Sequence, residues 1–244
     1  MDIRFDGKRP LVTGAGKSIG KGIAEALFAG GAETYALSRT HEDLDKLEAE
    51  NPGMHTVCVD LSDWATARKA VEQIGSVDLL VNNAGINELS PFLETEESQL
   101  NKILDINVKA VINVSQVVAK RMIDRGNGGA IVHISSRASQ EAVENHLSYC
   151  ATKGALDQVM RVMALELGPH QIRVNCVNPI IVMTRMGTGI WSDPVKSRSV
   201  ISRIPQGKCA EVKNVVHSVL YLLSDKADMI NGVTLMVDGG KAIT

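Results

Sequence analysis

The sequence of 244 residues lacks the features that define several special classes of protein. Four cysteines are spread along the chain with no short paired spacing, so neither a zinc knuckle nor a disulfide framework is expected; they are Cys58, Cys150, Cys176 and Cys209. No apolar run is long enough to span a bilayer, and the first residues carry charges where a signal peptide needs an apolar core. We therefore expect a cytoplasmic protein in a reducing compartment.

A large excess of charge of one sign is also missing, because the formal net charge is only -2 and no basic block occurs. This balance argues against a nucleic-acid or an anionic membrane surface and favours a small-molecule ligand. Hydrophobic residues make up 44% of the chain and charged residues 22%, with no disordered tract. No ligand set for a metal ion is apparent, and none is expected.

Apolar runs alternate with stretches of helical period along the whole sequence. This alternation is typical of a Rossmann-type, doubly wound parallel sheet of about seven strands with helices on both faces. We expect one domain over residues 1–244, since no internal boundary is visible. The expected strands are Pro10–Thr13, Glu33–Ser38, Met54–Val59, Val77–Val81, Ala130–Ser135, Arg173–Val177 and Val233–Val237.

Two long segments, Val108–Met122 and Tyr149–Leu167, are apolar around much of their circumference. Such helices lie fully in a core or also form a subunit interface, and we favour an interface in a homo-oligomer. A less regular segment near residues 184–203 contains Gly187, Gly189 and Pro194. We interpret it as a substrate lid, with an ordinary surface helix as the alternative.

A glycine-rich turn, Gly14-Ala-Gly-Lys-Ser-Ile-Gly20, follows the first expected strand and precedes a helix. Glycine at such a turn lets main-chain N–H groups and a helix N-terminus approach a pyrophosphate. Any tight connection between a strand and a helix also favours glycine. The position in the first strand-to-helix connection favours dinucleotide binding.

Tyr149 and Lys153 are four residues apart, so a helix would place both on one face. A free phenol has a pKa of about 10, and a neighbouring ammonium would lower the pKa of Tyr149 toward neutrality. The pair therefore indicates acid/base chemistry. On spacing alone, an exposed helical pair without function is the alternative.

The second expected strand ends at Ser38-Arg39-Thr40, without the acidic residue that usually binds the ribose 2′-hydroxyl of NAD. The two hydroxyls can donate to a 2′-phosphate, and the Arg39 guanidinium can pair with its charge. Lys17 supplies a second cation. The sequence thus predicts NADPH/NADP+ as the cofactor; a solvated Arg39 at the start of the next helix is the alternative.

Taken together, these motifs resemble the short-chain dehydrogenase/reductase family from about Gly7 to Gly240. The resemblance rests on the residues 13–20, on Asn82-Asn-Ala-Gly85, on Asn107, on Ser136 with Tyr149-x-x-x-Lys153, and on Asn178-Pro179. It implies a catalytic tetrad of Asn107, Ser136, Tyr149 and Lys153. Tyr149 would donate a proton, Ser136 would bind the carbonyl oxygen, Lys153 would hold the nicotinamide ribose, and Asn107 would order a relay water.

The resemblance also implies further contacts. The expected cofactor-binding residues are Gly14, Lys17, Ser18, Ile19, Gly20, Ser38, Arg39, Thr40, Asp60, Leu61, Asn83, Ala84, Gly85, Tyr149, Lys153, Val182 and Thr184. The expected substrate-binding residues are Ser136, Val143, His146, Tyr149 and Trp191. Two positions depart from the family pattern, because Ser18 and Ile180 replace glycines that many members have there.

The implied function is NADPH-dependent reduction of small polar carbonyl compounds, such as ketoses and vicinal dicarbonyls, by a homotetramer. A polar and bulky pocket wall suits a short ligand better than a long acyl chain. A 3-oxoacyl thioester or a steroid is the alternative substrate, since one fold serves many. An NADPH-binding structural protein without catalysis is the alternative of another class, although the complete tetrad argues against it.

Overall fold

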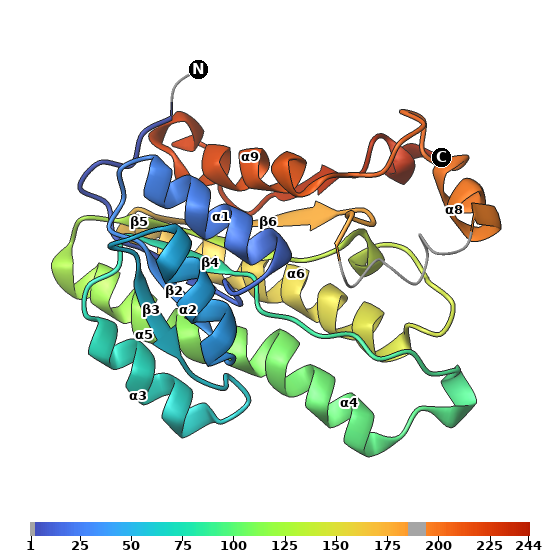
Figure 1. Cartoon of the computed structure of the whole chain (residues 1–244), viewed down its shortest axis with the longest axis horizontal. Helices are drawn as coiled ribbons and strands as arrows, with labels where there is room; N and C mark the ends of the chain where they lie inside the picture. Colours follow the sequence, from blue (N-terminus) through green and yellow to red (C-terminus); the bar gives the residue numbers. More distant parts are fainter. Residues whose placement is uncertain (1–2, 185–193) are drawn as a thin grey trace.

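The computed structural model describes residues 3–184 and 194–244, and its centre is one parallel sheet with the strand order β3-β2-β1-β4-β5-β6-β7 (Figure 1). Every neighbouring pair is parallel, which confirms the expected doubly wound fold. The strands are β1 (Pro10–Thr13), β2 (Tyr35–Ser38), β3 (His55–Cys58), β4 (Leu79–Asn82), β5 (Gly129–Ile134), β6 (Ile172–Pro179) and β7 (Thr234–Val237). All seven expected strands are present, with each bound within two residues of the expected one.

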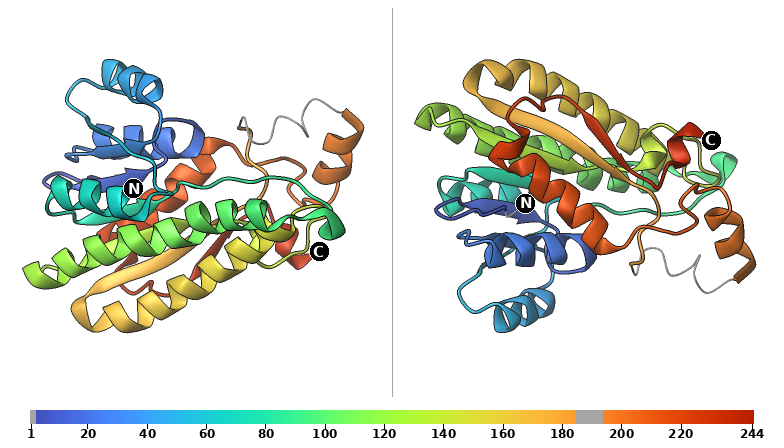
Figure 2. Two further views of the ribbon diagram at one scale, coloured as in Figure 1. Left: turned by 90° about the horizontal axis from the view of Figure 1, so that it is seen from below. Right: turned by 90° about the horizontal axis from the view of Figure 1, so that it is seen from above.

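Helices lie on both faces of the sheet. They are α1 (Ser18–Ala29), α2 (His41–Glu50), α3 (Trp64–Ile74), α4 (Glu97–Leu104), α5 (Ala110–Arg125), α6 (Leu147–Leu167), α8 (Pro194–Ile201) and α9 (Val212–Leu223). The two long helices are confirmed, and α5 and α6 run side by side (Figure 2). The first residues expected in α5 instead belong to a π-helical turn, η2 (Asp105–Lys109).

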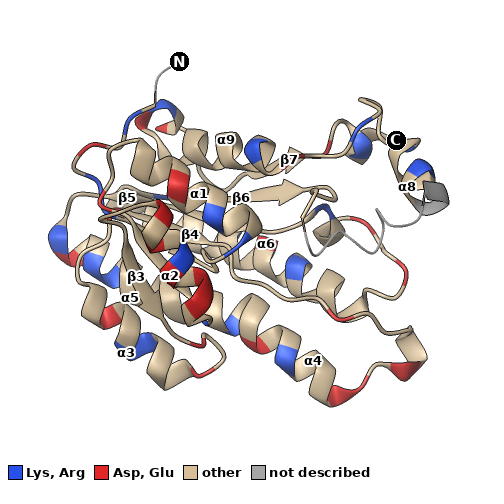
Figure 3. Ribbon diagram, in the orientation of Figure 1, with Lys and Arg blue, Asp and Glu red and all other residues tan. Residues whose placement is uncertain are grey.

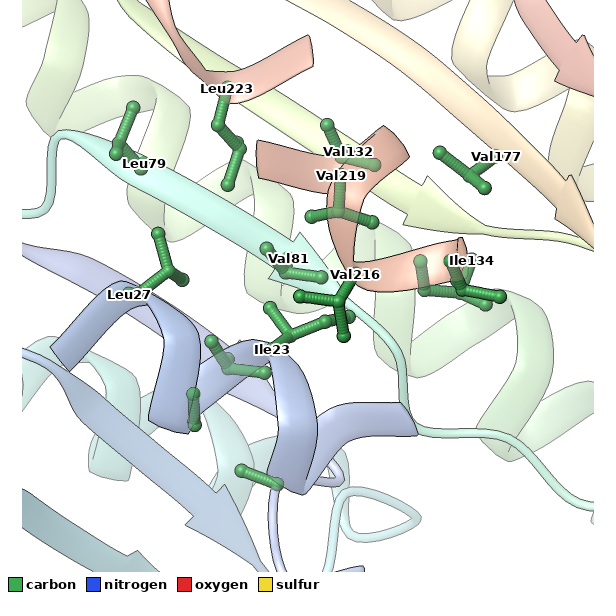
Figure 4. Close-up of a cluster of buried hydrophobic side chains, with 14 of the residues drawn as sticks. Ile23, Leu27, Leu79, Val81, Val132, Ile134, Val177, Val216, Val219 and Leu223 are labelled. Carbon is green, nitrogen blue, oxygen red and sulfur yellow. The ribbon is translucent and has the colours of Figure 1, made fainter. Parts of the chain in front are cut away.

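Alternation along the strands builds two cores, because successive side chains of a strand point to opposite faces. Val12, Val81 and Val132 contact α1 and α9 in one cluster. Val81 and Val132 are labelled in Figure 4 together with Ile23 of α1 and Val219 of α9. Leu11, Leu80 and Ile131, each one residue earlier, pack against α3, α5 and α6 in the other. Continuous apolar runs in the sequence are thus explained by strands that are buried on both faces.

The surface carries both signs of charge, with Lys and Arg interspersed among Asp and Glu on the outer helices (Figure 3). Many of these charges form ion pairs within one helix, such as Lys46 with Glu42 and Lys120 with Asp124. Among residues 3–184 and 194–244, no helix is both long and apolar enough to cross a membrane.

Candidate active site

A cleft of about 500 Å³ opens at the carboxyl ends of β1, β4, β5 and β6. Parallel strands bring the loops that follow them to one edge of the sheet, which is where such folds bind ligands. The lining includes most of the predicted site residues: Gly14, Lys17, Ser18, Ile19, Gly20, Asn83, Ala84, Gly85, Ser136, Val143, His146, Tyr149, Lys153, Val182 and Thr184. The structure therefore brings together motifs that are more than a hundred residues apart in the sequence.

The glycine-rich turn is held against the loop after β4. Thr13 Oγ1 accepts hydrogen bonds from the main-chain N–H groups of Asn83 (3.0 Å) and Ala84 (3.1 Å). A Cβ atom on Gly20 would lie 2.2 Å from the Gly14 carbonyl oxygen, and one on Gly14 would lie 2.8 Å from Ala84 Cα. Glycine at these two positions therefore allows the close approach of the turn and the loop.

Ser18 has φ of 51°, in the left-handed region that a non-glycine residue rarely adopts. This geometry explains why glycine is common at the position. A residue with a side chain is destabilised by about 1–2 kcal/mol in this conformation. Ile180, the other departure, causes no such strain. Its φ is not positive, its side chain is buried, and its main-chain N–H donates to Val237 O at 3.0 Å.

The adenosine end of the predicted site lies beside this turn. Ser38 ends β2 and pairs in register with Cys58 at the end of β3, and a Cβ on Gly16 would lie 2.9 Å from Ser38 Oγ. Arg39 is exposed, and it contributes, after the hydrogen bonds from Ser62, to a lowered pKa of Asp60. Thr40 and Leu61 flank these residues in the chain.

Lys17 has a partner that sequence reasoning missed. Its Nζ lies 2.8 Å from the carboxylate of Asp43 in α2, whose side chain is only 14% exposed. Asp43 also approaches Gly16, where a Cβ would lie 2.9 Å from Asp43 Cβ. A phosphate at this end of the cleft would therefore share Lys17 with a carboxylate, an interaction between separate elements that has no sequence signal.

The other end of the cleft brings together Ser136, Tyr149 and Lys153. Ser136 follows β5 in extended conformation, and its Oγ accepts the N–H of Ala138 at 3.1 Å. Lys153 is 4% exposed; its Nζ donates to Ile134 O at 2.8 Å and lies 5.5 Å from the centroid of the Tyr149 ring. Burial lowers the pKa of Lys153 to about 8, while Cys176 and Asp157 raise it.

The prediction that Lys153 lowers the pKa of Tyr149 is wrong in this structure. Burial is the largest influence and raises the pKa of the phenol, and Cys150 raises it as well. Only a hydrogen bond with Ser136 lowers it. Burial of the ring is therefore the dominant influence on this pKa, and the Lys153 ammonium donates its hydrogen bond to the Ile134 carbonyl.

Asn107 lies behind the cleft and is fully buried in the π-helical turn between α4 and α5. Its Oδ1 accepts the N–H of Ile86 at 2.9 Å, and its Nδ2 donates to Ile86 O (2.9 Å) and Thr152 Oγ1 (3.1 Å). A Cβ on Gly85 would lie 3.4 Å from Asn107 Oδ1 and 3.7 Å from Lys153 Nζ. Both polar groups therefore lie close to Gly85.

Only part of the predicted substrate-binding end of the cleft lies within the described residues. His146 precedes α6 and lies edge-on to the Tyr149 ring at 6.3 Å between centroids, while Val143 O accepts the His146 N–H at 3.1 Å. Trp191 and residues 185–193 of the expected lid lie outside the described residues. Lining residues that the sequence did not suggest are Asn87, Ile134, Ser135, Arg137, Ala138, Pro179, Ile180 and Ile181. Each lies within three residues of a predicted site residue in the chain, and this proximity was the available signal.

Comparison with known proteins identifies relatives over the whole length of the chain. Residues 14–242 match the family model described as enoyl-(acyl carrier protein) reductase. The L-xylulose reductase of Bos taurus is 55% identical over 240 residues (98% of both chains), and the D-erythrulose reductase of Gallus gallus is 54% identical over 239 residues (98% of this chain and 97% of the relative). The crystal structure of gluconate 5-dehydrogenase from Burkholderia cenocepacia, in complex with NADP and tartrate, superimposes with a TM-score of 0.94 at 31% identity, covering 100% of this chain and 98% of the other.

The fold and the cleft define a dinucleotide-binding oxidoreductase scaffold. The chain belongs to the short-chain dehydrogenase/reductase family.

Proposed function

We propose that this protein is an NADPH-dependent carbonyl reductase whose substrates are small polar carbonyl compounds, L-xylulose (reduced to xylitol) and vicinal dicarbonyls among them. The observation that carries the proposal is the convergence of Ser136, Tyr149 and Lys153 at one end of a cleft whose other end is the glycine-rich turn. The similarity to an L-xylulose reductase and a D-erythrulose reductase supports small hydroxylated ketones as the substrate class.

The cleft fits a dinucleotide. Gly14 and Gly20 leave space that a side chain would fill, and the first turn of α1 has no acidic residue to repel a pyrophosphate. Asn87 Oδ1 is buried in the cleft without a hydrogen-bond partner among the described residues. When bound, NADPH supplies the hydride that reduces the carbonyl carbon.

The residues of this chain supply the remaining chemistry. Ser136 Oγ donates a hydrogen bond to the carbonyl oxygen, and Tyr149 Oη gives that oxygen a proton as negative charge develops on it. Burial keeps the phenol protonated at neutral pH, which suits a proton donor. Lys153 and Asn107, which both lie close to Gly85, would form the proton path behind Tyr149.

The quaternary and cellular context belongs to the same proposal. We propose one domain over residues 1–244 with a lid near residues 184–203, acting as a homotetramer in the cytoplasm. The groove between α5 and α6 and the free edge of β7 support the assembly. Val143 and His146 beside Tyr149 suit a short polar ligand, and Trp191 and the lid remain proposed contacts.

The first test is Tyr149→Phe, which removes the proton donor and little volume. We expect kcat to fall by at least about a thousandfold, within the range that general acid catalysis contributes, with the Kd for NADPH changed by less than about twofold. Tyr221→Phe in α9, outside the lining of the cleft, is the matched control and should retain its activity. Steady-state assays would use NADPH with ketoses, dicarbonyls, 3-oxoacyl thioesters and steroids.

Each result distinguishes one alternative. Higher kcat/KM on acyl thioesters or steroids would replace the substrate class but keep the chemistry. NADPH binding without turnover of any carbonyl would identify a cofactor-binding structural protein. Activity retained by Tyr149→Phe would reject the proton donor.

A further inference from the structure

A buried carboxylate lies behind the reacting groups and outside the lining of the cleft. Asp157 is in α6, one helical turn after Lys153, and is 3% exposed. Burying a charge is costly unless hydrogen bonds compensate it. Asp157 Oδ2 accepts a hydrogen bond from Ser139 Oγ at 2.6 Å and lies 3.0 Å from Asn178 Nδ2.

The two partners of Asp157 both hold the main chain of Ser136. Asn178 Nδ2 donates to the Ser136 carbonyl oxygen at 3.0 Å, and the Ser139 N–H donates to the same oxygen at 3.0 Å. Asn178 must direct its amide N–H groups here, because the Ser136 carbonyl and the carboxylate can only accept. The carboxylate therefore fixes the orientation of the amide that anchors Ser136.

Asp157 also acts on Lys153 through its charge. The charged and titratable groups that face Lys153 come from three elements: His133 in β5, Cys176 in β6, and Tyr149 and Asp157 in α6. Asp157 and Cys176 raise the pKa of Lys153, against the larger lowering by burial. Removing the Asp157 carboxylate would therefore lower the pKa of Lys153 further.

We propose that Asp157 is a positioning residue for carbonyl reduction, which through Asn178 and Ser139 fixes the main chain that presents the Ser136 hydroxyl to the substrate. The inference rests on the proposed function of Ser136. It assigns a role in the reaction to a residue that touches neither substrate nor cofactor, and it makes β6 and α6 joint supports of the loop after β5.

Two variants separate the hydrogen bond from the charge. Asp157→Asn removes the carboxylate and can place a second amide donor against Asn178. We expect kcat to fall by about tenfold to a hundredfold, as for a small misplacement of a reacting group, with KM for NADPH changed by less than about threefold. Ser139→Ala removes the 2.6 Å bond and keeps the charge, so we expect a smaller loss of kcat.

The pH profile provides a readout that a purely structural role would not change. With Asp157→Asn, the alkaline limb of kcat/KM should move to lower pH by at least about half a unit, because the neighbouring carboxylate no longer favours protonated Lys153. With Ser139→Ala the limb should stay in place. Equal limbs in both variants and the wild type would overturn the electrostatic part of the role.

Hydrogen exchange tests the positioning without any turnover. The N–H groups of Ala138, Ser139 and Gln140 are hydrogen-bonded within the loop after β5. Peptides covering residues 136–146 should exchange at least about fivefold faster in both variants, while peptides from α9 keep their wild-type rates. Unchanged exchange and an unchanged kcat would overturn the inference. Absence of turnover in the wild type would reject only the proposed function, since the exchange result stands independently.

Discussion

Single residues at the end of β2 determine the cofactor preference that we predict. Ser38, Arg39 and Thr40 present hydroxyls and a cation where NAD enzymes place a carboxylate. Arg39 is exposed and adjoins Asp60, while Lys17 is paired with Asp43. The structure thus leaves Arg39 as the cation more accessible to a 2′-phosphate than Lys17.

We predict a preference for NADPH over NADH of at least about a hundredfold in kcat/KM, equivalent to roughly 2.7 kcal/mol. Ser38→Asp combined with Arg39→Ala should move the preference toward NADH, because it installs a repulsive carboxylate and removes the charge partner. Arg39→Lys, which keeps the charge and loses the planar fork, should give an intermediate ratio. Initial rates with both cofactors would measure it, and equal use by the wild type would reject the interpretation of this segment.

His133 in β5 is fully buried, and its Nε2 has no hydrogen-bond partner in the described structure. Burial, with a smaller contribution from the charge of Lys153, lowers its pKa from 6.5 to about 3. The unfolded chain therefore binds a proton between about pH 6.5 and pH 3 that the folded chain does not bind. By linkage, this residue stabilises the fold fully above pH 6.5, and its contribution is lost as the pH falls below that value.

We predict that protonation of unfolded His133 lowers the free energy of unfolding by about 2 kcal/mol between pH 7.5 and pH 5. His133→Asn should reduce this loss, whereas His217→Asn, at an exposed position of α9, should leave it unchanged. Urea titrations at both pH values and at fixed protein concentration would measure the difference. The same loss in His133→Asn as in the wild type would contradict the assignment.

At the scale of elements, the start of α1 depends on a glycine that the sequence pattern singled out. A Cβ at Gly20 would lie 2.2 Å from the Gly14 carbonyl and 2.4 Å from Asn83 Nδ2, both in the loops that form the cleft. Gly154 in α6 is also helical, but its Cβ would meet nothing closer than the Ser139 carbonyl at 3.7 Å. The two glycines therefore make a matched pair.

We predict that Gly20→Ala destabilises the protein by about 2 kcal/mol or more and weakens NADPH binding, because the turn must move away from the loop after β4. Gly154→Ala should stabilise it by up to about 1 kcal/mol, since alanine favours the helix and the space is sufficient. Thermal unfolding of both variants, with NADPH titrations, would show the opposite signs. A stable Gly20→Ala protein would contradict the close approach.

The sequence predicted the strands and helices well where the local pattern of apolar residues determines them. The bounds of β1 agree with the prediction, because its apolar run ends directly at the glycine-rich turn. It could not predict the π-helical turn at Asn107, since that geometry depends on Ile86 and Thr152 from other elements. Likewise, the pKa of Tyr149 depends on burial, which no spacing of residues reveals.

At the scale of the whole molecule, two apolar surfaces on the described part of the chain are candidates for subunit interfaces. One is a groove of about 810 Å³ between α5 and α6, lined by Ile112, Ala119, Ile123, Ala155, Val159, Val162 and Met163 among others. The other follows β7, the last strand of the sheet order, beside the exposed Met229 and Val233. If each surface packs against its own copy in a second chain, the two together would generate a closed tetramer.

We predict a homotetramer of the 26.2 kDa chain at micromolar concentration, measured by light scattering. Val162→Glu, which places a charge in the groove, should yield dimers, because only the β7 surface would remain. Lys46→Gln, on the exposed side of α2, should leave the assembly unchanged. A wild-type monomer would reject both interfaces.

The order of the strands also has a consequence for how the chain acquires its fold. β1 pairs on one side with β2, the next strand in the chain, and on the other side with the later strand β4; the contact from Arg9 to Asp78 at that second junction spans 69 positions. Closing so long a segment costs entropy before any contact compensates it, so such pairings form slowly. During synthesis, the glycine-rich turn cannot make its contacts with the loop after β4 until that loop has been synthesised. The complete cleft can assemble only after Thr184 has emerged. A ribosome-bound fragment that ends before β4 should therefore be a poor binder of NADPH.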